Sequence, residues 1–266
     1  MSSRIVVTVI SRRVLLRGGI AAGAGALLAV GTREAWDAYQ ATQPLPFYGG
    51  PESGIRPDLS VPHAAGEEVI WRGSEQAPKR IALTFDDGPH PQWTPRVLTT
   101  LAEHDVPATF FLKGVNVRDH GAIHRDSGKH ELANHTWDHP DLARLDQPAV
   151  ADQIARCTAA IEDTYGRSPR LFRPPYGHFG GSTVLACAEA GLPVVLWSMQ
   201  FREADFVTHP DDIAAEVARQ AHPGAIILGH DCGAQERLVA IDRLGTIIGA
   251  LKDRGFSFVT VSSLLA

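Results

Sequence analysis

From residue 80 onward the chain alternates short apolar runs with longer amphipathic segments. The apolar runs cover residues 80–88, 107–114, 130–136, 170–177, 192–199, 224–231 and 257–265. Short apolar runs bounded by turn residues are typical of buried strands, so each run is predicted to be a strand.

The segments between the runs repeat apolar residues at helical spacing, as Ile154, Cys157 and Ile161 illustrate. Proline near their starts and glycine after their ends support the boundaries. Helices are therefore predicted at residues 94–105, 148–166, 182–191, 209–221 and 236–255.

Strands that alternate with helices predict an α/β fold with a parallel sheet and right-handed crossovers. About seven strands in a single domain are compatible with a (β/α) barrel or a doubly wound sheet, and the pattern alone does not separate them. Polar residues gather where the predicted strands end, and in a barrel these ends meet at one mouth, which favours the barrel. These residues are Asp86, Asp87, Lys113, His135, Arg173, Ser198, His230 and Asp231.

The start of the chain has a different composition. Five arginines precede the first acidic residue, Glu34, and the stretch between Arg17 and Arg33 is uncharged and rich in Gly and Ala. A basic start before a short apolar run is typical of an export signal, and "SRRVLLRG" at residues 11–18 resembles a twin-arginine signal. A chance arginine pair in a general secretory signal is the alternative. The expected division is residues 1–33 as signal peptide or N-terminal anchor, 34–78 as a Pro/Gly-rich linker or lead-in, and 79–266 as one domain.

Charge and cysteine content narrow the possible functions. The 25 basic and 30 acidic side chains give a formal charge of -5, which argues against nucleic acid as a partner. The three cysteines, Cys157, Cys187 and Cys232, form no CxxC pair, so neither a thiolate zinc site nor a disulfide framework is expected.

Two adjacent acids, Asp86 and Asp87, end the first predicted strand in "LTFDDGP". An Asp-Asp-Gly sequence by itself is usually a turn. At the C-terminal end of a strand, however, neighbouring side chains point to opposite faces. One acid could then bind a metal while the other stays free as a base.

His135 and His139 stand four residues apart in "HTWDH", close enough to share a metal ion on one turn. Thr136 occupies the position of Glu in the metalloprotease HExxH motif, and Pro140 disfavours a helix at His139. Such a pair is more often a surface feature. Combined with an aspartate, it gives a His-His-Asp set with an open position for water, as in catalytic zinc sites.

Two further strand ends carry candidate residues. Arg173 in "FRPPYG" could form a structural ion pair or hold a carboxylate in place, and Tyr176 could offer its side chain or its backbone N–H. His230 in "IILGHD" could be a buried, satisfied histidine, but at this mouth a general acid is the better hypothesis.

The motifs "TFDDG", "HTWDH", "RPPYG" and "ILGHD" resemble, in order and spacing, those of the polysaccharide deacetylase (NodB-like) domain of carbohydrate esterase family four. The resemblance covers about residues 79–266. It implies a single catalytic domain with a distorted (β/α) barrel of about seven parallel strands. It also implies removal of acetyl groups from N-acetylglucosamine units of chitin or peptidoglycan, or from acetylated xylan.

The resemblance also implies residue roles. Asp86 would be the general base, paired with Arg173. Zn²⁺, or another divalent metal such as Co²⁺, Ni²⁺ or Mn²⁺, would be held by Asp87, His135 and His139. His230 would be the general acid. Substrate contacts would come from the backbone N–H of Tyr176 at the oxyanion, from Leu228 in the acetyl pocket, and from Pro175.

Two segments depart from the family pattern. The family has an Asp, two or three residues, then Asp-Trp, whereas "WSMQFREADF" places Gln200 at the first Asp and Phe206 at the Trp. Asp205, about two residues late, is expected to orient His230. The region before His130 is short, so the helix between the second and third predicted strands is expected to be reduced.

The expected function is metal-dependent hydrolysis of N-acetyl groups on a peptidoglycan-type or chitin-type polysaccharide. The alternatives are an O-acetyl esterase on acetylated xylan, a catalytically weak cell-wall binding protein, and a structural zinc protein. The expected protein is a monomer that contacts a membrane only through its N-terminal segment. It is exported by the twin-arginine pathway and is extracellular or associated with the cell wall.

Overall fold

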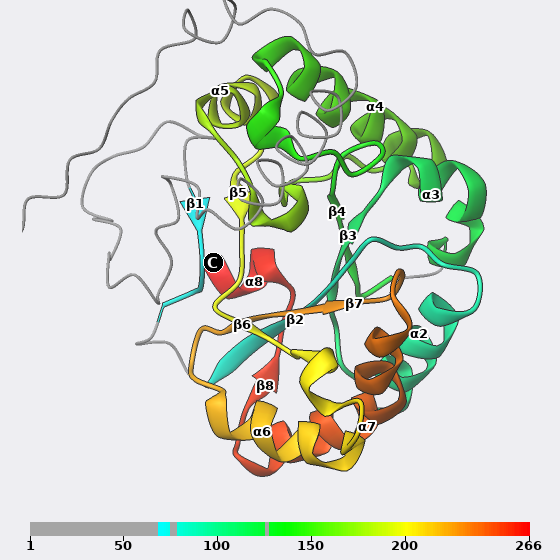
Figure 1. Ribbon diagram of the computed structural model, residues 1–266, viewed down its shortest axis with the longest axis vertical. Coiled ribbons are helices and arrows are strands. Elements are labelled where there is room, and N and C mark those ends of the chain that lie inside the picture. Colours follow the sequence, from blue (N-terminus) through cyan, green and yellow to red (C-terminus); the bar gives the residue numbers. More distant parts are fainter. Residues whose placement is uncertain (1–68, 75–78, 126–127) are drawn as a thin grey trace, which may run out of the picture. The chain divides into compact units, whose positions relative to one another are not determined.

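The computed structural model describes residues 69–74, 79–125 and 128–266 (Figure 1). The predicted signal and most of the predicted lead-in lie outside the described residues. The strands are β1 (Val69–Ile70), β2 (Arg80–Asp86), β3 (Thr109–Leu112), β4 (Glu131–Asn134), β5 (Val194–Val195), β6 (Met199–Gln200), β7 (Ile226–His230) and β8 (Ser257–Phe258). The α-helices are α2 (Trp93–Glu103), α3 (Gly114–His120), α4 (Gln147–Tyr165), α5 (Gly181–Ala190), α6 (Ile213–Gln220), α7 (Leu238–Asp253) and α8 (Val261–Leu265).

The strands pair in parallel, as the alternation of strands and helices predicted. The main sheet has the order β4-β3-β2-β7-β6, β8 pairs with β2, and β1 pairs with β5. Single-residue bridges at Phe172 link β4 to β5, and the chain continues from β5 to β6, which pairs with β7. The pairings therefore follow an interrupted ring, and the predicted α/β fold with parallel strands is confirmed.

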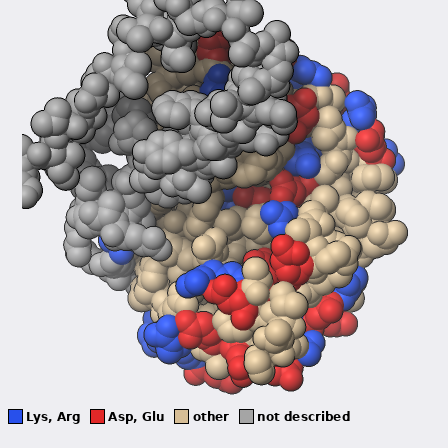
Figure 2. Space-filling model, in the orientation of Figure 1, with Lys and Arg blue, Asp and Glu red and all other residues tan. Residues whose placement is uncertain are grey.

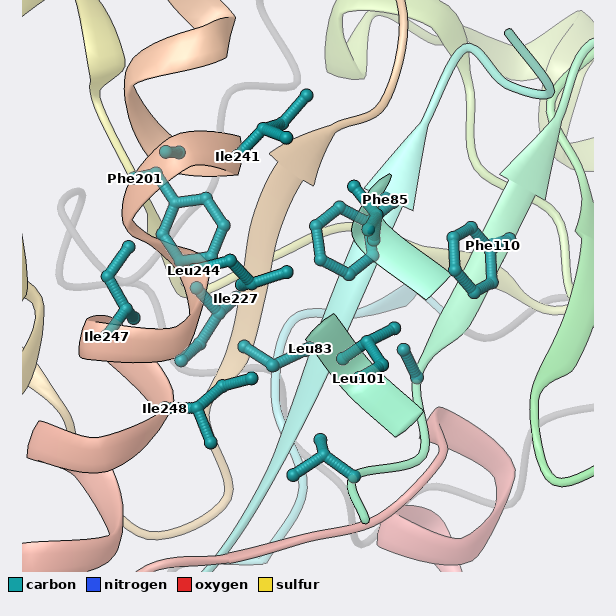
Figure 3. Close-up of a cluster of buried hydrophobic side chains, with 14 of the residues drawn as sticks. Leu83, Phe85, Leu101, Phe110, Phe201, Ile227, Ile241, Leu244, Ile247 and Ile248 are labelled. Carbon is teal, nitrogen blue, oxygen red and sulfur yellow. The ribbon is translucent and has the colours of Figure 1, made fainter. Parts of the chain in front are cut away.

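Side chains of the central strands alternate between two faces. Leu83 and Phe85 of β2 pack with Phe110 and with apolar residues of α2 and α7 in the largest hydrophobic cluster (Figure 3). Because side chains alternate along a strand, Thr84 and Asp86 project to the opposite, inner face. In the register with β7, Thr84 lies beside Leu228 and Asp86 beside His230, so these residues share that face.

The predicted helices lie close to their expected positions. The longest, α4, begins where the Asp146 side chain accepts a hydrogen bond from Ala149 N–H and ends at Gly166 with φ of 67°. These are ordinary start and stop signals. In Figure 1, α4 lies against α5 on one side of the strands, and α6 lies against α7 on the other. Helix α3 is short, as predicted from the short segment that precedes His130.

Three predictions of secondary structure were wrong. The predicted strand 170–177 is reduced to the bridge at Phe172, because Pro174 and Pro175 have no N–H to donate to a ladder. In the predicted strand 257–265 only Ser257–Phe258 is extended. Helix α8 follows, because Thr260 Oγ1 accepts a hydrogen bond from Ser263 N–H as a helix N-cap. Val69–Ile70, inside the expected loop-like lead-in, pairs with β5.

All three cysteines are free thiols. Within the described ranges, no helix has the length and apolar character needed to cross a membrane. On the described part of the face in Figure 2, Lys and Arg side chains are interspersed with Asp and Glu over the end formed by α6 and α7.

Candidate active site

The two acids at the end of β2 converge on one histidine. Asp87 has a positive φ of 75°, which is uncommon for a residue other than glycine and interrupts the alternation of the strand. As a result, His135 Nε2 lies 3.8 Å from Asp86 Oδ2 and also 3.8 Å from Asp87 Oδ1. The two carboxylates thus face the same site, where strict alternation would have separated them.

The two histidines lie on one turn after β4, as predicted. Thr136 and His139 both have φ of 69°. The turn is stabilised by Thr136 N–H, which donates to Asn134 Oδ1 at 2.9 Å, and by His139 N–H, which donates to Thr136 Oγ1 at 3.1 Å. Backbone strain of this kind is concentrated at functional sites. The imidazole rings meet edge to face, with centroids 5.0 Å apart.

Asp87, His135 and His139 lie together as a group that could hold a metal ion, called here the metal-binding group. One ligand atom from each lies within 4.8 Å of the others. His135 Nδ1 lies 2.7 Å from the carbonyl of Arg173, which can only accept, so Nδ1 carries a proton and Nε2 is the nitrogen that faces the two carboxylates. Burial and the neighbouring His135 lower the pKa of His139 to about 4, despite the nearby carboxylates, so this ring is neutral at pH 7.

The carboxylate of Asp87 fits the same role. Burial alone would raise its pKa, but three nearby histidines and Arg237 together lower it to about 2. His139 Nε2 lies 3.2 Å from Asp87 Oδ1. Among the residues that the structure describes, no hydrogen-bond donor satisfies this buried oxygen. A buried carboxylate oxygen without a donor is costly, and a cation would satisfy it, so the donor set suits a divalent metal.

Arg173 is fully buried and holds Asp86. Its Nη1 donates to Asp86 Oδ1 at 2.7 Å and to Thr84 Oγ1 at 2.8 Å, while Nε and Nη2 donate to the carbonyls of Val195 and Leu196. Burial lowers the pKa of Arg173, and Asp86 raises it. The pairing occupies Oδ1 of Asp86, whereas Oδ2 faces His135.

His230 lies at the end of β7, and its acidic neighbour differs from the predicted one. His230 Nδ1 is 3.8 Å from Oε1 of Glu203, which is almost completely buried. Asp205 is half-exposed and pairs with Arg202 at 2.7 Å. It lines a surface cavity of about 390 Å³ that no residue of the metal-binding group lines. The expectation that Asp205 orients His230 is therefore corrected in favour of Glu203.

The sequence contained a signal for Glu203. In the family pattern two or three residues separate the first Asp from the second, and Gln200 stands at the first. Two residues, Phe201 and Arg202, separate Gln200 from Glu203, which has an acidic side chain. The short 3₁₀ helix Glu203–Phe206 turns this side chain inward and Asp205 outward.

The predicted substrate-contacting residues surround the same mouth. Tyr176 is 57% exposed, has φ of 60°, and packs its ring against His139 with centroids 4.6 Å apart. Pro175 is buried directly before it, and Leu228 is buried on the inner face of β7.

Two residues near the site were not predicted to have a role. Arg237, from the 3₁₀ helix Gln235–Arg237, donates from Nη1 to Asp87 Oδ2 at 2.7 Å. Asp231 is fully buried, and burial raises its pKa to about 7 although Thr94 Oγ1 donates to it at 2.6 Å. Asp231 is the last residue of "GHD", but nothing in the local sequence of Arg237 indicates its contact with Asp87.

Comparisons with known proteins agree with this geometry. The Polysaccharide deacetylase family model matches residues 73–195. A chitooligosaccharide deacetylase from Sinorhizobium fredii is 39% identical over 202 residues, which cover 71% of this chain and 92% of that protein. The peptidoglycan-N-acetylglucosamine deacetylase PgdA of Listeria monocytogenes is 38% identical over 193 residues, or 70% of this chain, but the match spans only 39% of that relative's length.

A solved structure supports the same relationship. The crystal structure of a peptidoglycan N-acetylglucosamine deacetylase in complex with an N-hydroxybenzamide ligand superposes with a TM-score of 0.70 at 32% identity. The superposition covers 74% of this chain and 92% of that one. The motifs, the arrangement of Asp86, Asp87, His135 and His139, and these similarities together show that the chain belongs to the polysaccharide deacetylase family.

Proposed function

We propose that this chain is a metal-dependent hydrolase that removes N-acetyl groups from N-acetylglucosamine units of a peptidoglycan-type or chitin-type polysaccharide. The observation that carries the proposal is a metal-binding group with a separate carboxylate, Asp86, beside it. The named activities of the relatives, peptidoglycan-N-acetylglucosamine deacetylase and chitooligosaccharide deacetylase, support it.

Asp87, His135 and His139 would hold Zn²⁺ or another divalent metal such as Co²⁺, Ni²⁺ or Mn²⁺. Three protein ligands are typical of catalytic sites, whereas structural zinc sites usually have four, which disfavours the structural alternative. When bound, the ion would lower the pKa of a water molecule and polarise the acetyl carbonyl.

Asp86 is suited to be the general base. Arg173 fixes one of its carboxylate oxygens, and the other oxygen faces the metal-binding group. Asp86 therefore takes the proton from the attacking water as the acetyl carbon is attacked. Proton transfer of this kind contributes about 10²- to 10⁴-fold to the rate.

His230 is suited to protonate the amine that leaves, and Glu203 is placed to orient its ring. The backbone N–H of Tyr176 would donate to the oxyanion, where one donor is typically worth roughly 10² to 10³ in rate. Leu228 and Pro175 would provide the apolar wall around the acetyl methyl group.

Two other functions make different predictions. An O-acetyl esterase on acetylated xylan would use the same residues, but an alcohol leaves more easily than an amine, so His230→Ala would harm an esterase less. A catalytically weak cell-wall binding protein would not need a base, yet Asp86 and Arg173 form a complete buried pair.

We further propose that residues 1–33 export the protein by the twin-arginine pathway or anchor it, and that residues 34–78 link them to the catalytic domain, 79–266. The support is the sequence "SRRVLLRG" and the action of relatives on peptidoglycan, a cell-wall polymer. The protein would act as a monomer outside the cell or at the cell wall.

The substrate is tested by measuring acetate release from N-acetylglucosamine oligomers, peptidoglycan and acetylated xylan, each with and without chelator. Chelator-sensitive release from the amino-sugar polymers is expected. Release from xylan alone would establish the esterase, and no release from any polymer by the metal-loaded protein would support a binding role.

A further inference from the structure

We propose that Arg237 is a positioning residue that restricts Asp87 to a single metal-binding oxygen and so keeps coordination positions open at the ion. This inference rests on the proposed metal site. It adds a residue from the loop after β7, far from the metal-binding group in sequence.

The contacts divide the two oxygens of Asp87 between different partners. Arg237 Nη1 donates to Oδ2 at 2.7 Å and to the carbonyl of Cys232 at 2.5 Å. Oδ1 instead faces His139 Nε2 at 3.2 Å. The guanidinium thus occupies the oxygen that would otherwise be free to bind the same ion as Oδ1.

The loop after β7 is shaped around this guanidinium. Gly233 has φ of 113°, and a Cβ at this position would lie 2.3 Å from Arg237 Nη1. A larger residue would be strained at this φ and would displace the guanidinium from its present position. On the other side of Asp87, Asn116 Nδ2 donates to its backbone carbonyl at 2.6 Å. Asp87 is therefore held from two directions, and only its carboxylate depends on Arg237.

Removal of Arg237 has consequences for metal affinity and for turnover that differ in sign. A neutral residue would free Oδ2 to bind the ion together with Oδ1, and it would remove a positive charge that repels the cation. Both effects strengthen metal binding, by at least about tenfold even with strong solvent screening. The first effect also lowers turnover, because a second carboxylate oxygen fills a position that the reaction needs open.

The experiment compares Co²⁺ binding by the wild type, Arg237→Met and Arg237→Lys. Affinity is measured by competition with a chelator, and coordination number by the intensity of the visible Co²⁺ absorption. Arg237→Met is expected to bind Co²⁺ at least about tenfold more tightly, to absorb more weakly as the coordination number rises, and to release acetate more slowly. Arg237→Lys keeps a charged donor and is expected to remain close to the wild type in all three.

Arg243→Met is the matched control, since Arg243 makes a similar 2.8 Å pair with Asp211 on the surface. Equal unfolding midpoints of the metal-free proteins establish that the variants fold. If Arg237→Met is unstable, Arg237→Gln replaces it with the same expected direction. Unchanged or weaker Co²⁺ binding, or an unchanged spectrum, would overturn the proposal. A wild type that binds no Co²⁺ would instead overturn the proposed metal site itself.

Discussion

Asp86→Asn separates the role proposed for Asp86, the general base, from that proposed for Asp87, a metal ligand. Asparagine has the shape of aspartate and still offers Arg173 an oxygen acceptor, but it cannot take a proton from water. Asp86 is outside the group of proposed metal ligands, and its carboxylate Oδ2 lies 3.8 Å from Nε2 of His135, a member of that group. The variant should therefore keep its metal and lose its turnover.

Asp86→Asn is expected to affect both the rate and the stability. Loss of a general base lowers kcat by about 10²- to 10⁴-fold, which is ~3–5 kcal/mol of activation free energy. Arg173 is fully buried, so removal of the charge of Asp86 also costs stability, up to ~3–5 kcal/mol if the remaining acceptors compensate little. The assay must therefore be run well below the unfolding midpoint of the variant.

Metal content and acetate release are measured on the same preparations of the wild type, Asp86→Asn and Asp87→Asn. Asp86→Asn is expected to retain about one metal ion per chain with little activity, whereas Asp87→Asn loses both because it removes a ligand. If Asp86→Asn lost its metal together with its activity, or retained most of its activity, the division of roles between the two acids would be refuted.

Three further predictions concern the surroundings of the site and the core. Glu203→Gln should lower kcat by about 10- to 100-fold, as loss of a residue that orients a functional histidine does, while Asp205→Asn changes it less than about twofold; equal effects would show that Glu203 does not act through His230. Arg173→Met leaves buried acceptors unpaired and should lower the free energy of unfolding by about 3–5 kcal/mol, measured by urea titration; a loss below about 1 kcal/mol would contradict this. Burial lowers the pKa of His124 from 6.5 to about 3. Between these two pH values the unfolded chain binds a proton at His124 that the folded chain does not, so the stability falls as the pH falls. His124→Leu should reduce that slope by up to about 1.4 kcal/mol per pH unit in urea titrations between pH ~4 and 7, and an unchanged slope would refute it.

Much of the site was predictable because each strand end carries its own local signal. Asp86, His135, Arg173 and His230 all directly follow or end apolar runs, and parallel strands bring such ends to one edge. Predicting that these residues converge therefore required only the correct fold class and not the conformation of any loop.

The contacts that were not predicted depend on loop conformation. The choice between Glu203 and Asp205 is decided by one short 3₁₀ helix, preceded by Arg202 with φ of 54°. Arg237 reaches Asp87 across 150 residues of sequence through a loop that Gly233 permits. Similarly, the end of the chain was predicted as a strand because the apolar pattern does not reveal that Thr260 caps a helix.

The central claim is that a metal ion held by Asp87, His135 and His139 is required for deacetylation. The direct measurement is to remove metal with chelator and add Zn²⁺ back in steps while acetate release from an N-acetylglucosamine oligomer is followed. The account predicts no acetate release without metal and a rise in release that ends at about one ion per chain. His135→Ala is expected neither to bind the ion nor to release acetate. Undiminished release from fully metal-free protein, or full metal binding by His135→Ala, would contradict it.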